Sequence, residues 1–175
     1  MLKYALYDYF PKRMLRKASF EEQEISRRIL LFKTGHNAAT AWAVRAFVST
    51  LSMMNLEDTI IIPIPASCQL TYTRRFSRFM KTLCKATGAI NGFSFVKVNG
   101  HRNKAHIAKG KAAERLNNIS IDTDSIKGKK VVIIDDICTT GNTAEIFTRM
   151  IHDAGADVRM ILFLGKTKNY RKYNS

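Results

Sequence analysis

Residues 131–145, VVIIDDICTTGNTAE, decide the fold class of this chain. Four consecutive β-branched residues predict a buried strand, and two acids, Asp135 and Asp136, stand at its end. A short turn then leads into a segment with apolar residues at helical spacing. Strand, turn and helix in this order are typical of α/β folds with a parallel sheet. Such folds bind ligands beyond the carboxyl ends of their strands, which is where both carboxylates are expected.

The same alternation of elements extends to both sides of this stretch. Apolar spacing, a capping-box pattern at Ser19 and Glu22, and glycine stops predict four helices. They lie at about 20–33, 37–54, 71–86 and 142–154. Short β-branched or aromatic runs predict strands in TIIIPIPAS (59–67), FSFVKV (93–98), VVIID (131–135) and MILFL (160–164). The predicted fold is therefore α/β, with a mostly parallel sheet flanked by helices.

Length and composition indicate one globular domain over residues 1–175. We divide it into an N-terminal helical part (1–58), an α/β core (59–165) and a basic tail (166–175). Within the core, the glycine-interrupted, basic stretch at about 99–112 is predicted to be a long mobile loop. There is no run of eighteen apolar residues and no C-x-x-C pair, so we expect a cytoplasmic protein with no membrane span and reduced cysteines. Nothing in the sequence indicates an oligomeric state.

Net charge is the unusual feature of the composition. The chain carries 29 Lys and Arg against 14 Asp and Glu, which gives +15. Between residues 71 and 115 there are eleven basic residues and a single acid, Glu114. A field of this sign attracts a nucleic acid backbone or a phosphorylated small molecule, although a solvated basic surface explains it equally well.

The turn after the acids has the chemistry of a phosphate site. Hydroxyls, a flexible glycine and the free N–H groups of a helix start come together in five residues. These are Thr139, Thr140, Gly141, Asn142 and Thr143. Asn142 tolerates a left-handed backbone, which would help the turn to close. Because the acids would repel a phosphate, we expect them to accept hydrogen bonds from sugar hydroxyls or to assist a divalent cation.

Other readings of this segment remain open on the residues alone. It could be an ordinary strand, turn and helix start, with Thr139 or Thr140 as the N-cap. Paired aspartates at strand ends also occur in phosphoacceptor domains and in magnesium-dependent phosphatases.

The full string IIDDICTTGNT resembles the signature of type I phosphoribosyltransferases, which bind phosphoribosyl diphosphate (PRPP). IIPIPAS (61–67) resembles the diphosphate-binding loop of that family. The layout of RRF, a basic loop and KAAERLNNI resembles the ComF-like, competence-associated group. Together the likeness runs from about residue 30 to residue 167. It implies a cytoplasmic, Mg²⁺-dependent transferase that moves a phosphoribosyl group to an unidentified acceptor.

The resemblance also implies roles for individual residues. Asp135 and Asp136 would be catalytic, contacting the ribose hydroxyls, while positions 139–143 hold the 5-phosphate. The diphosphate would approach Ile64, Pro65, Ala66 and Ser67. The basic residues of the predicted loop that could stabilise the leaving group are Arg102, Lys104, Lys109, Lys111 and Arg115, with Arg75 behind them. No side chain is assigned as a direct metal ligand.

Two departures from the family pattern stand out. ComF-like proteins often begin with a four-cysteine zinc segment, which this sequence lacks, so zinc is not expected. Asn142 replaces the usual Gly or Ala and could crowd the phosphate. Two other functions stay open: a PRPP sensor without turnover, and a single-stranded DNA-binding accessory protein. In the latter, Tyr72, Phe76 and Phe79 could stack on bases, although their helical spacing favours the core.

Overall fold

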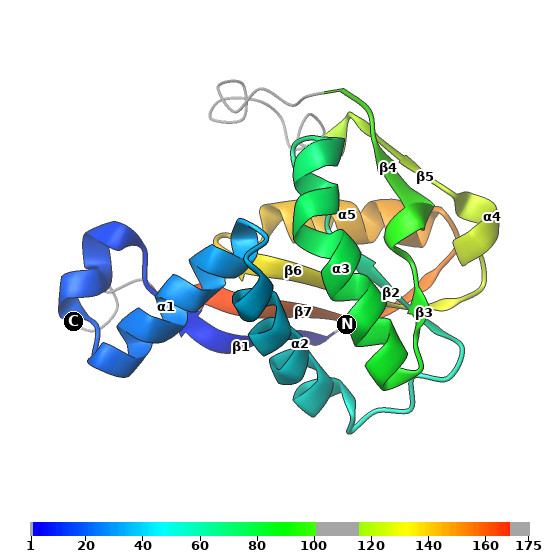
Figure 1. Ribbon diagram of the computed structural model, residues 1–175. Coiled ribbons are helices and arrows are strands. Elements are labelled where there is room, and N and C mark those ends of the chain that lie inside the picture. The colour runs from blue at the N-terminus through cyan, green and yellow to red at the C-terminus, as the bar shows by residue number, and fades with distance from the viewer. Residues whose placement is uncertain (1, 101–115, 169–175) are drawn as a thin grey trace.

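A five-stranded parallel sheet forms the centre of the protein, as Figure 1 shows. The computed structural model describes residues 2–100 and 116–168. The strands run in the order β1-β7-β6-β2-β3, and every neighbouring pair is parallel. Their bounds are β1 Leu2–Tyr9, β2 Thr59–Pro63, β3 Ile90–Asn91, β6 Lys130–Cys138 and β7 Asp157–Thr167. This confirms the predicted α/β fold with a parallel sheet.

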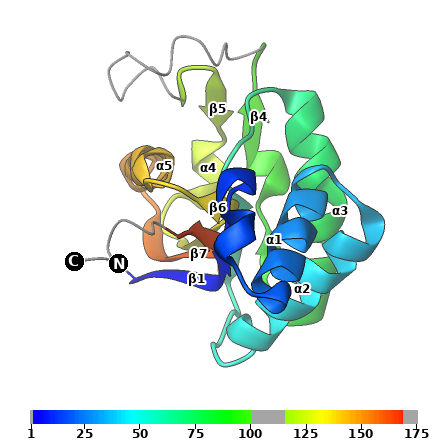
Figure 2. The ribbon, with the colours of Figure 1, turned by 90° about the vertical axis from the view of Figure 1, so that its left-hand side faces the viewer.

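Helices cover both faces of this sheet (Figure 2). One layer contains α1, α2 and α3, with α5 on the opposite face. Their bounds are α1 Phe20–Lys33, α2 Asn37–Leu51, α3 Gln69–Thr87 and α5 Asn142–Asp153. A two-stranded antiparallel sheet (β4 Val96–Val98, β5 Ile119–Ile121) and α4, Thr123–Ile126, lie on the α5 side. Two 3₁₀ turns, η1 Lys12–Lys17 and η2 Phe93–Phe95, complete the described elements.

Alternation along the central strands divides the core into two halves. In β6, Val132 and Ile134 face the α1–α3 layer, whereas Val131 and Ile133 face α5. All four side chains are fully buried, as β-branched residues are in a strand covered on both faces. Packing on both faces of the sheet thus fixes the position of β6, and with it the position of Asp135 near the carboxyl end of the strand.

The helix ends follow the sequence signals. Ser19 accepts a hydrogen bond from the N–H of Glu22, whose carboxylate accepts one from the Ser19 N–H, so the capping box is present. Gly88 ends α3 in a left-handed conformation, as glycines after helices commonly do. All four predicted helices are confirmed within a few residues.

Two parts of the sequence prediction differ from the structure. The N-terminal part, which we described as helical, begins with strand β1 at the edge of the main sheet, where Leu2 pairs with Met160. The stretch at 93–98 is a strand only from Val96, because Phe93–Phe95 forms a 3₁₀ turn, and β4 joins the small sheet rather than the main one. β1 is placed by its pairing with β7, which is distant in sequence, whereas β4 pairs with β5, the next strand along the chain.

Within the described ranges, no helix is long and apolar enough to cross a membrane.

Candidate functional site

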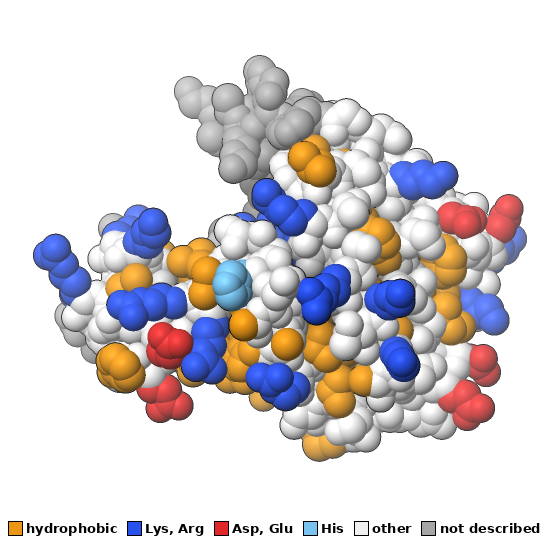
Figure 3. Space-filling model, in the orientation of Figure 1, with side chains coloured by type: hydrophobic (Ala, Val, Ile, Leu, Met, Phe, Trp, Pro, Cys, Tyr) orange, Lys and Arg blue, Asp and Glu red, His pale blue; other side chains and the backbone are white. Residues whose placement is uncertain are grey.

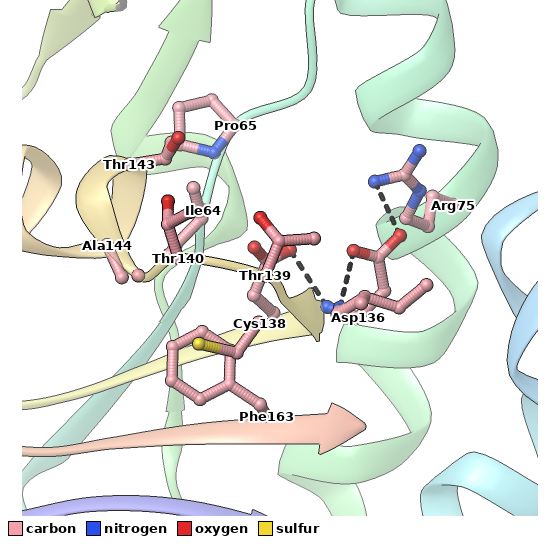
Figure 4. Close-up of a pocket in the computed structure, with 13 residues that line it drawn as sticks. Ile64, Pro65, Arg75, Asp136, Cys138, Thr139, Thr140, Thr143, Ala144 and Phe163 are labelled. Atoms are coloured by element: carbon pink, nitrogen blue, oxygen red, sulfur yellow. Dashed lines mark hydrogen bonds and ion pairs between the residues drawn. The ribbon is translucent and has the colours of Figure 1, made fainter. Parts of the chain in front are cut away.

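The ends of β6 and β2 and the start of α5 enclose a cavity of about 150 Å³ (Figure 4). Its wall contains both acids and four residues of the predicted phosphate turn. The wall residues discussed below are Ile64, Pro65, Arg75, Asp135, Asp136, Cys138, Thr139, Thr140, Gly141 and Thr143. The structure therefore brings together segments that are some seventy residues apart in sequence. Asn142, Ala66 and Ser67 are not among the wall residues.

Gly141 makes the turn between β6 and α5 possible. Its φ of 83° lies in the left-handed region, where a side chain would be strained, and it is the N-cap residue of α5. The N–H of Asn142, the first residue of α5, donates to the Thr140 hydroxyl at 3.5 Å. Because Gly141 has no side chain to cap the helix, the N–H groups that follow in the first turn keep the capacity to bind an anion. Asn142 is the first residue of the helix and does not have a positive φ, so the left-handed role that we considered for it is wrong.

The two acids at the end of β6 lie in different surroundings. Asp135 keeps part of its surface accessible, and its Oδ1 accepts the N–H of Asp136 at 2.8 Å. Asp136 is only 4% exposed, and its Oδ1 accepts the N–H of Ile137 at 2.7 Å. Burial, together with the neighbouring charge of Asp136, raises the pKa of Asp135 above its usual range.

Arg75 brings a positive charge into this site from α3. Its Nη1 lies 2.9 Å from Oδ2 of Asp136, and both side chains are nearly buried. The contact is an ion pair rather than a well-directed hydrogen bond, since Oδ2 has no hydrogen-bond partner of good geometry among the described residues. Sequence reasoning placed Arg75 behind the loop residues. In the structure, Arg75 lines the cavity and supplies the basic side chain among the described residues of its wall.

The segment after β2 is held against β6 by hydrogen bonds. The N–H of Ile64 donates to the Ile134 carbonyl at 2.8 Å, and the hydroxyl of Tyr72 donates to the Pro63 carbonyl at 3.2 Å. Burial raises the pKa of Tyr72, with a further contribution from the charge of Asp135, so its hydroxyl stays protonated as a donor. These bonds place Ile64 and Pro65 opposite the phosphate turn.

The cysteine in the turn is unsuited to nucleophilic chemistry. Burial, the main cause, raises the pKa of Cys138, so the thiol stays protonated at neutral pH. Cys84 is buried in the core, and burial raises its pKa to about 12. Cys68 is the N-cap residue of α3. It is only half-buried, and its Sγ lies 3.3 Å from the Thr71 hydroxyl.

The aromatic residues considered for base stacking lie inside the protein. Tyr72, Phe76 and Phe79 are at most 1% exposed and pack together on the buried face of α3. Figure 3 shows basic side chains spread over the helical layer, and α2 and α3 contain no acid. This face is therefore positively charged, but Tyr72, Phe76 and Phe79 are not exposed on it and could not stack on bases.

The remaining candidates lie outside the described residues. These are the basic positions Arg102, Lys104, Lys109, Lys111 and Arg115. Among the residues that the structure does describe, no cluster of three His, Cys, Asp or Glu could hold a metal ion.

The cavity lies within a region that matches a known protein family. The model of the phosphoribosyl transferase domain family matches residues 36–174, which include the whole cavity wall. The chain belongs to this family. Its phosphoribosyl transferase domain therefore spans α2 to β7, with β1 and α1 preceding the matched region.

Relatives of this phosphoribosyl transferase domain share a short segment with it. The chain is 51% identical over 47 residues to the adenine phosphoribosyltransferase of Lachnoclostridium phytofermentans, covering 26% of this chain and 27% of that protein. The adenine phosphoribosyltransferase of Mesomycoplasma hyopneumoniae strain 7448 is 49% identical over 47 residues, or 26% and 28% of the two chains. The chain thus spans about a quarter of the length of the curated relatives it matches.

A solved structure shows the same fold. The crystal structure of adenine phosphoribosyltransferase from Rhodothermus marinus superposes with a TM-score of 0.50 at 21% identity. The match covers 75% of this chain and 69% of that one. This likeness places the sheet and its helices in the architecture of the phosphoribosyltransferases.

Proposed function

We propose that the chain binds PRPP in the cavity at the end of β6 and transfers its phosphoribosyl group to a nucleophile. One observation carries this proposal: the start of α5, with Gly141 as its N-cap residue, and the carboxylate of Asp135 share a single cavity wall. The first attracts a phosphate, and the second accepts a hydrogen bond from a sugar hydroxyl. A ribose 5-phosphate offers both groups in one molecule.

The orientation of the substrate follows from these two contacts. With its 5-phosphate on the turn at 139–143 and its ribose beside Asp135, the ligand would direct C1 toward Ile64 and Pro65. That segment approaches from β2, opposite the turn, and supports the predicted position of the diphosphate. Ala66 and Ser67 would continue this side of the site beyond the cavity wall.

The proposed reaction is a substitution at C1 of the ribose. The bond from C1 to the diphosphate oxygen breaks, with the electron pair leaving on the diphosphate, while the nucleophile donates a pair to C1. Positive charge develops on the sugar ring, and a nearby carboxylate stabilises it. Any proton that the nucleophile loses passes to solvent or to the released diphosphate.

The cavity also suits a divalent cation that accompanies the diphosphate. Its wall presents carboxylate and hydroxyl oxygens, the kind of donor that Mg²⁺ prefers, and Mg²⁺ commonly takes most of its ligands from substrate phosphates and water. When bound, Mg²⁺ would neutralise charge on the departing diphosphate. The basic residues predicted at 102–115 are proposed to act on the same group.

Two further proposals concern the acceptor of the phosphoribosyl group and the subgroup of the family to which the chain belongs. The named relatives are adenine phosphoribosyltransferases, so adenine is the first acceptor to test. The layout of RRF (74–76), a basic loop and KAAERLNNI (111–119) in the sequence is the argument for a place in the ComF-like group. Tyr72, Phe76 and Phe79 are buried, so they do not support the alternative function of single-stranded DNA binding by base stacking.

Calorimetric titration with PRPP, with and without Mg²⁺, tests the proposal directly. We expect saturable heat that Asp135→Asn reduces at least tenfold in affinity, since a hydrogen bond to a charged group contributes about 1.5–3 kcal/mol. Asp153→Asn, on an exposed carboxylate at the end of α5, is the matched control. Absence of heat at millimolar PRPP would refute binding. Binding without diphosphate release, when adenine and other nucleophiles are added, would identify a sensor rather than an enzyme.

A further inference from the structure

The small sheet of β4 and β5 is hydrogen-bonded to the segment that is predicted to meet the diphosphate. Asn118, the residue before β5, donates from its side-chain Nδ2 to the Ser67 carbonyl at 3.4 Å. Gln69, at the start of α3, accepts the N–H of Val98 on its side-chain Oε1 at 2.9 Å. Figures 1 and 2 both show β4 and β5 beside α3. The end of the segment 64–67 is therefore tied to the small sheet on both sides of Cys68.

The two linking residues are also held on their own elements. The backbone carbonyl of Asn118 accepts the Asn99 N–H at 2.7 Å, which continues the pairing of β4 with β5. The Nε2 of Gln69 donates to the Thr73 hydroxyl, one turn further along α3, at 3.1 Å. Both ends of the Gln69 amide are thus engaged. Neither residue has to be ordered anew in order to reach across to its partner.

The small sheet is a firm support for these bonds. Val96 and Leu116 are at most 2% exposed and pack in the same half of the core as Ile64. Phe93, just before β4, stacks on Tyr72 of α3 with ring centroids 4.7 Å apart. Close-packed interiors resist displacement, so a shift of the small sheet would disturb all of these contacts. The sheet can therefore hold Ser67 in a fixed place relative to β6.

The side chain of Asn118 is not explained by stability alone. Its Oδ1 is buried and has no hydrogen-bond partner among the described residues. A buried acceptor without a donor costs stability, whereas a leucine of similar size would not incur that cost. Its Nδ2, by contrast, has a specific partner in the Ser67 carbonyl. The contact with the predicted diphosphate segment is the evident use of this amide.

We propose that Asn118 and Gln69 are positioning residues that set the segment 64–67 at the correct distance from the phosphate turn. The inference rests on the proposed function and deepens it. A ligand with a 5-phosphate and a diphosphate must meet both sides of the cavity at once, so its affinity depends on that distance. A ligand with the 5-phosphate alone depends on the turn and does not sense the segment.

Two ligands separate this role from a purely structural one. PRPP and ribose 5-phosphate are titrated by calorimetry, with Mg²⁺ present, into wild type and Asn118→Leu. We expect Asn118→Leu to weaken PRPP binding about tenfold and ribose 5-phosphate binding by less than about twofold. Its melting temperature should change by less than about 3 °C, because the unpaired buried oxygen is removed together with the donor. Asn117→Leu, at the exposed neighbouring position, is the matched control and should leave both affinities within about twofold.

Gln69→Met tests the second link independently. Methionine keeps the length of the side chain and is a good helix former, but it cannot accept the Val98 N–H as the amide does. The same selective loss of PRPP affinity is expected. This variant also decides the question if Asn118→Leu does not fold.

The outcomes distinguish this inference from the proposed function. Equal weakening of PRPP and ribose 5-phosphate would indicate a general structural role and would overturn the inference alone. Unchanged PRPP affinity in Asn118→Leu or in Gln69→Met would overturn it as well, and so would an equal loss in Asn117→Leu. Failure of wild type to bind PRPP would overturn the proposed function, and this inference with it.

Discussion

Asp135→Asn is expected to stabilise the protein while weakening its proposed ligand binding. The carboxylate sits where burial and the neighbouring Asp136 both disfavour its charge. Asparagine keeps a similar shape, and its Oδ1 can still accept the Asp136 N–H. The substitution therefore removes the unfavourable charge and retains the hydrogen bond.

The pH dependence of this effect follows from the direction of the shift. The pKa of Asp135 is raised in the folded protein above its ordinary value of 3.8, so the folded state holds the proton more tightly than the unfolded chain. Below the ordinary pKa the carboxyl is protonated in both states, and its stability contribution is fully present. As pH rises toward the folded pKa that contribution is lost, at up to about 1.4 kcal/mol for each pH unit.

The magnitude is readily measurable in a chain of this size. A change of about 1 kcal/mol moves the melting temperature by about 2–4 °C. We expect Asp135→Asn to melt at least 2 °C above wild type at pH 7.5, with the difference shrinking toward zero as pH falls to about 4. Differential scanning fluorimetry across this pH range is sufficient.

The control is Asp153→Asn, whose carboxylate is 79% exposed and should give no difference beyond about 0.5 kcal/mol. A lower melting temperature for Asp135→Asn at pH 7.5 would refute the reasoning, since it would mean that the charged carboxylate stabilises the fold. An increase of equal size at every pH would also refute it, because the effect would then not come from titration.

Three further predictions concern the turn, the sheet and the cysteines. Thr140→Val should weaken the binding of inorganic phosphate about tenfold or more in calorimetry, whereas Thr82→Val, at an exposed position of α3 outside the cavity wall, should not. Gly92→Ala should lower the melting temperature by several degrees, because the added Cβ would lie 2.6 Å from two isoleucine side chains of β2. Overpacking of this kind costs about 1–3 kcal/mol. An unchanged melting temperature would contradict this close packing. Iodoacetamide at pH 7.5 should modify Cys68 faster than Cys138, as followed by mass spectrometry. The pKa of Cys68 is lowered by its hydrogen bonds with Thr71, whereas burial raises the pKa of Cys138. Faster modification of Cys138 would contradict these environments.

Much of the fold was predictable because its signals are local. The capping box at Ser19, the glycine after α3 and the β-branched run of β6 each act within a few residues, and the structure has all three. The strand β1 was missed, since an edge strand with exposed Leu2 and Tyr4 lacks the continuous apolar run of a buried one. Its position is decided by pairing with β7, more than 150 residues away in sequence.

The sequence by itself determined the chemistry at the end of β6: two acids, a glycine turn and a helix start in one short stretch. The sequence could not distinguish the environments of the two acids. Adjacent side chains in a strand point to opposite faces, but the sequence does not show which residues each of them contacts there. Only the tertiary structure decided that Asp136, in the cavity wall beside Asp135, forms an ion pair with Arg75 of α3. The physical reason is that an ion pair between elements sixty residues apart forms only when packing of α1, α3 and the sheet brings the charges together and removes the water between them.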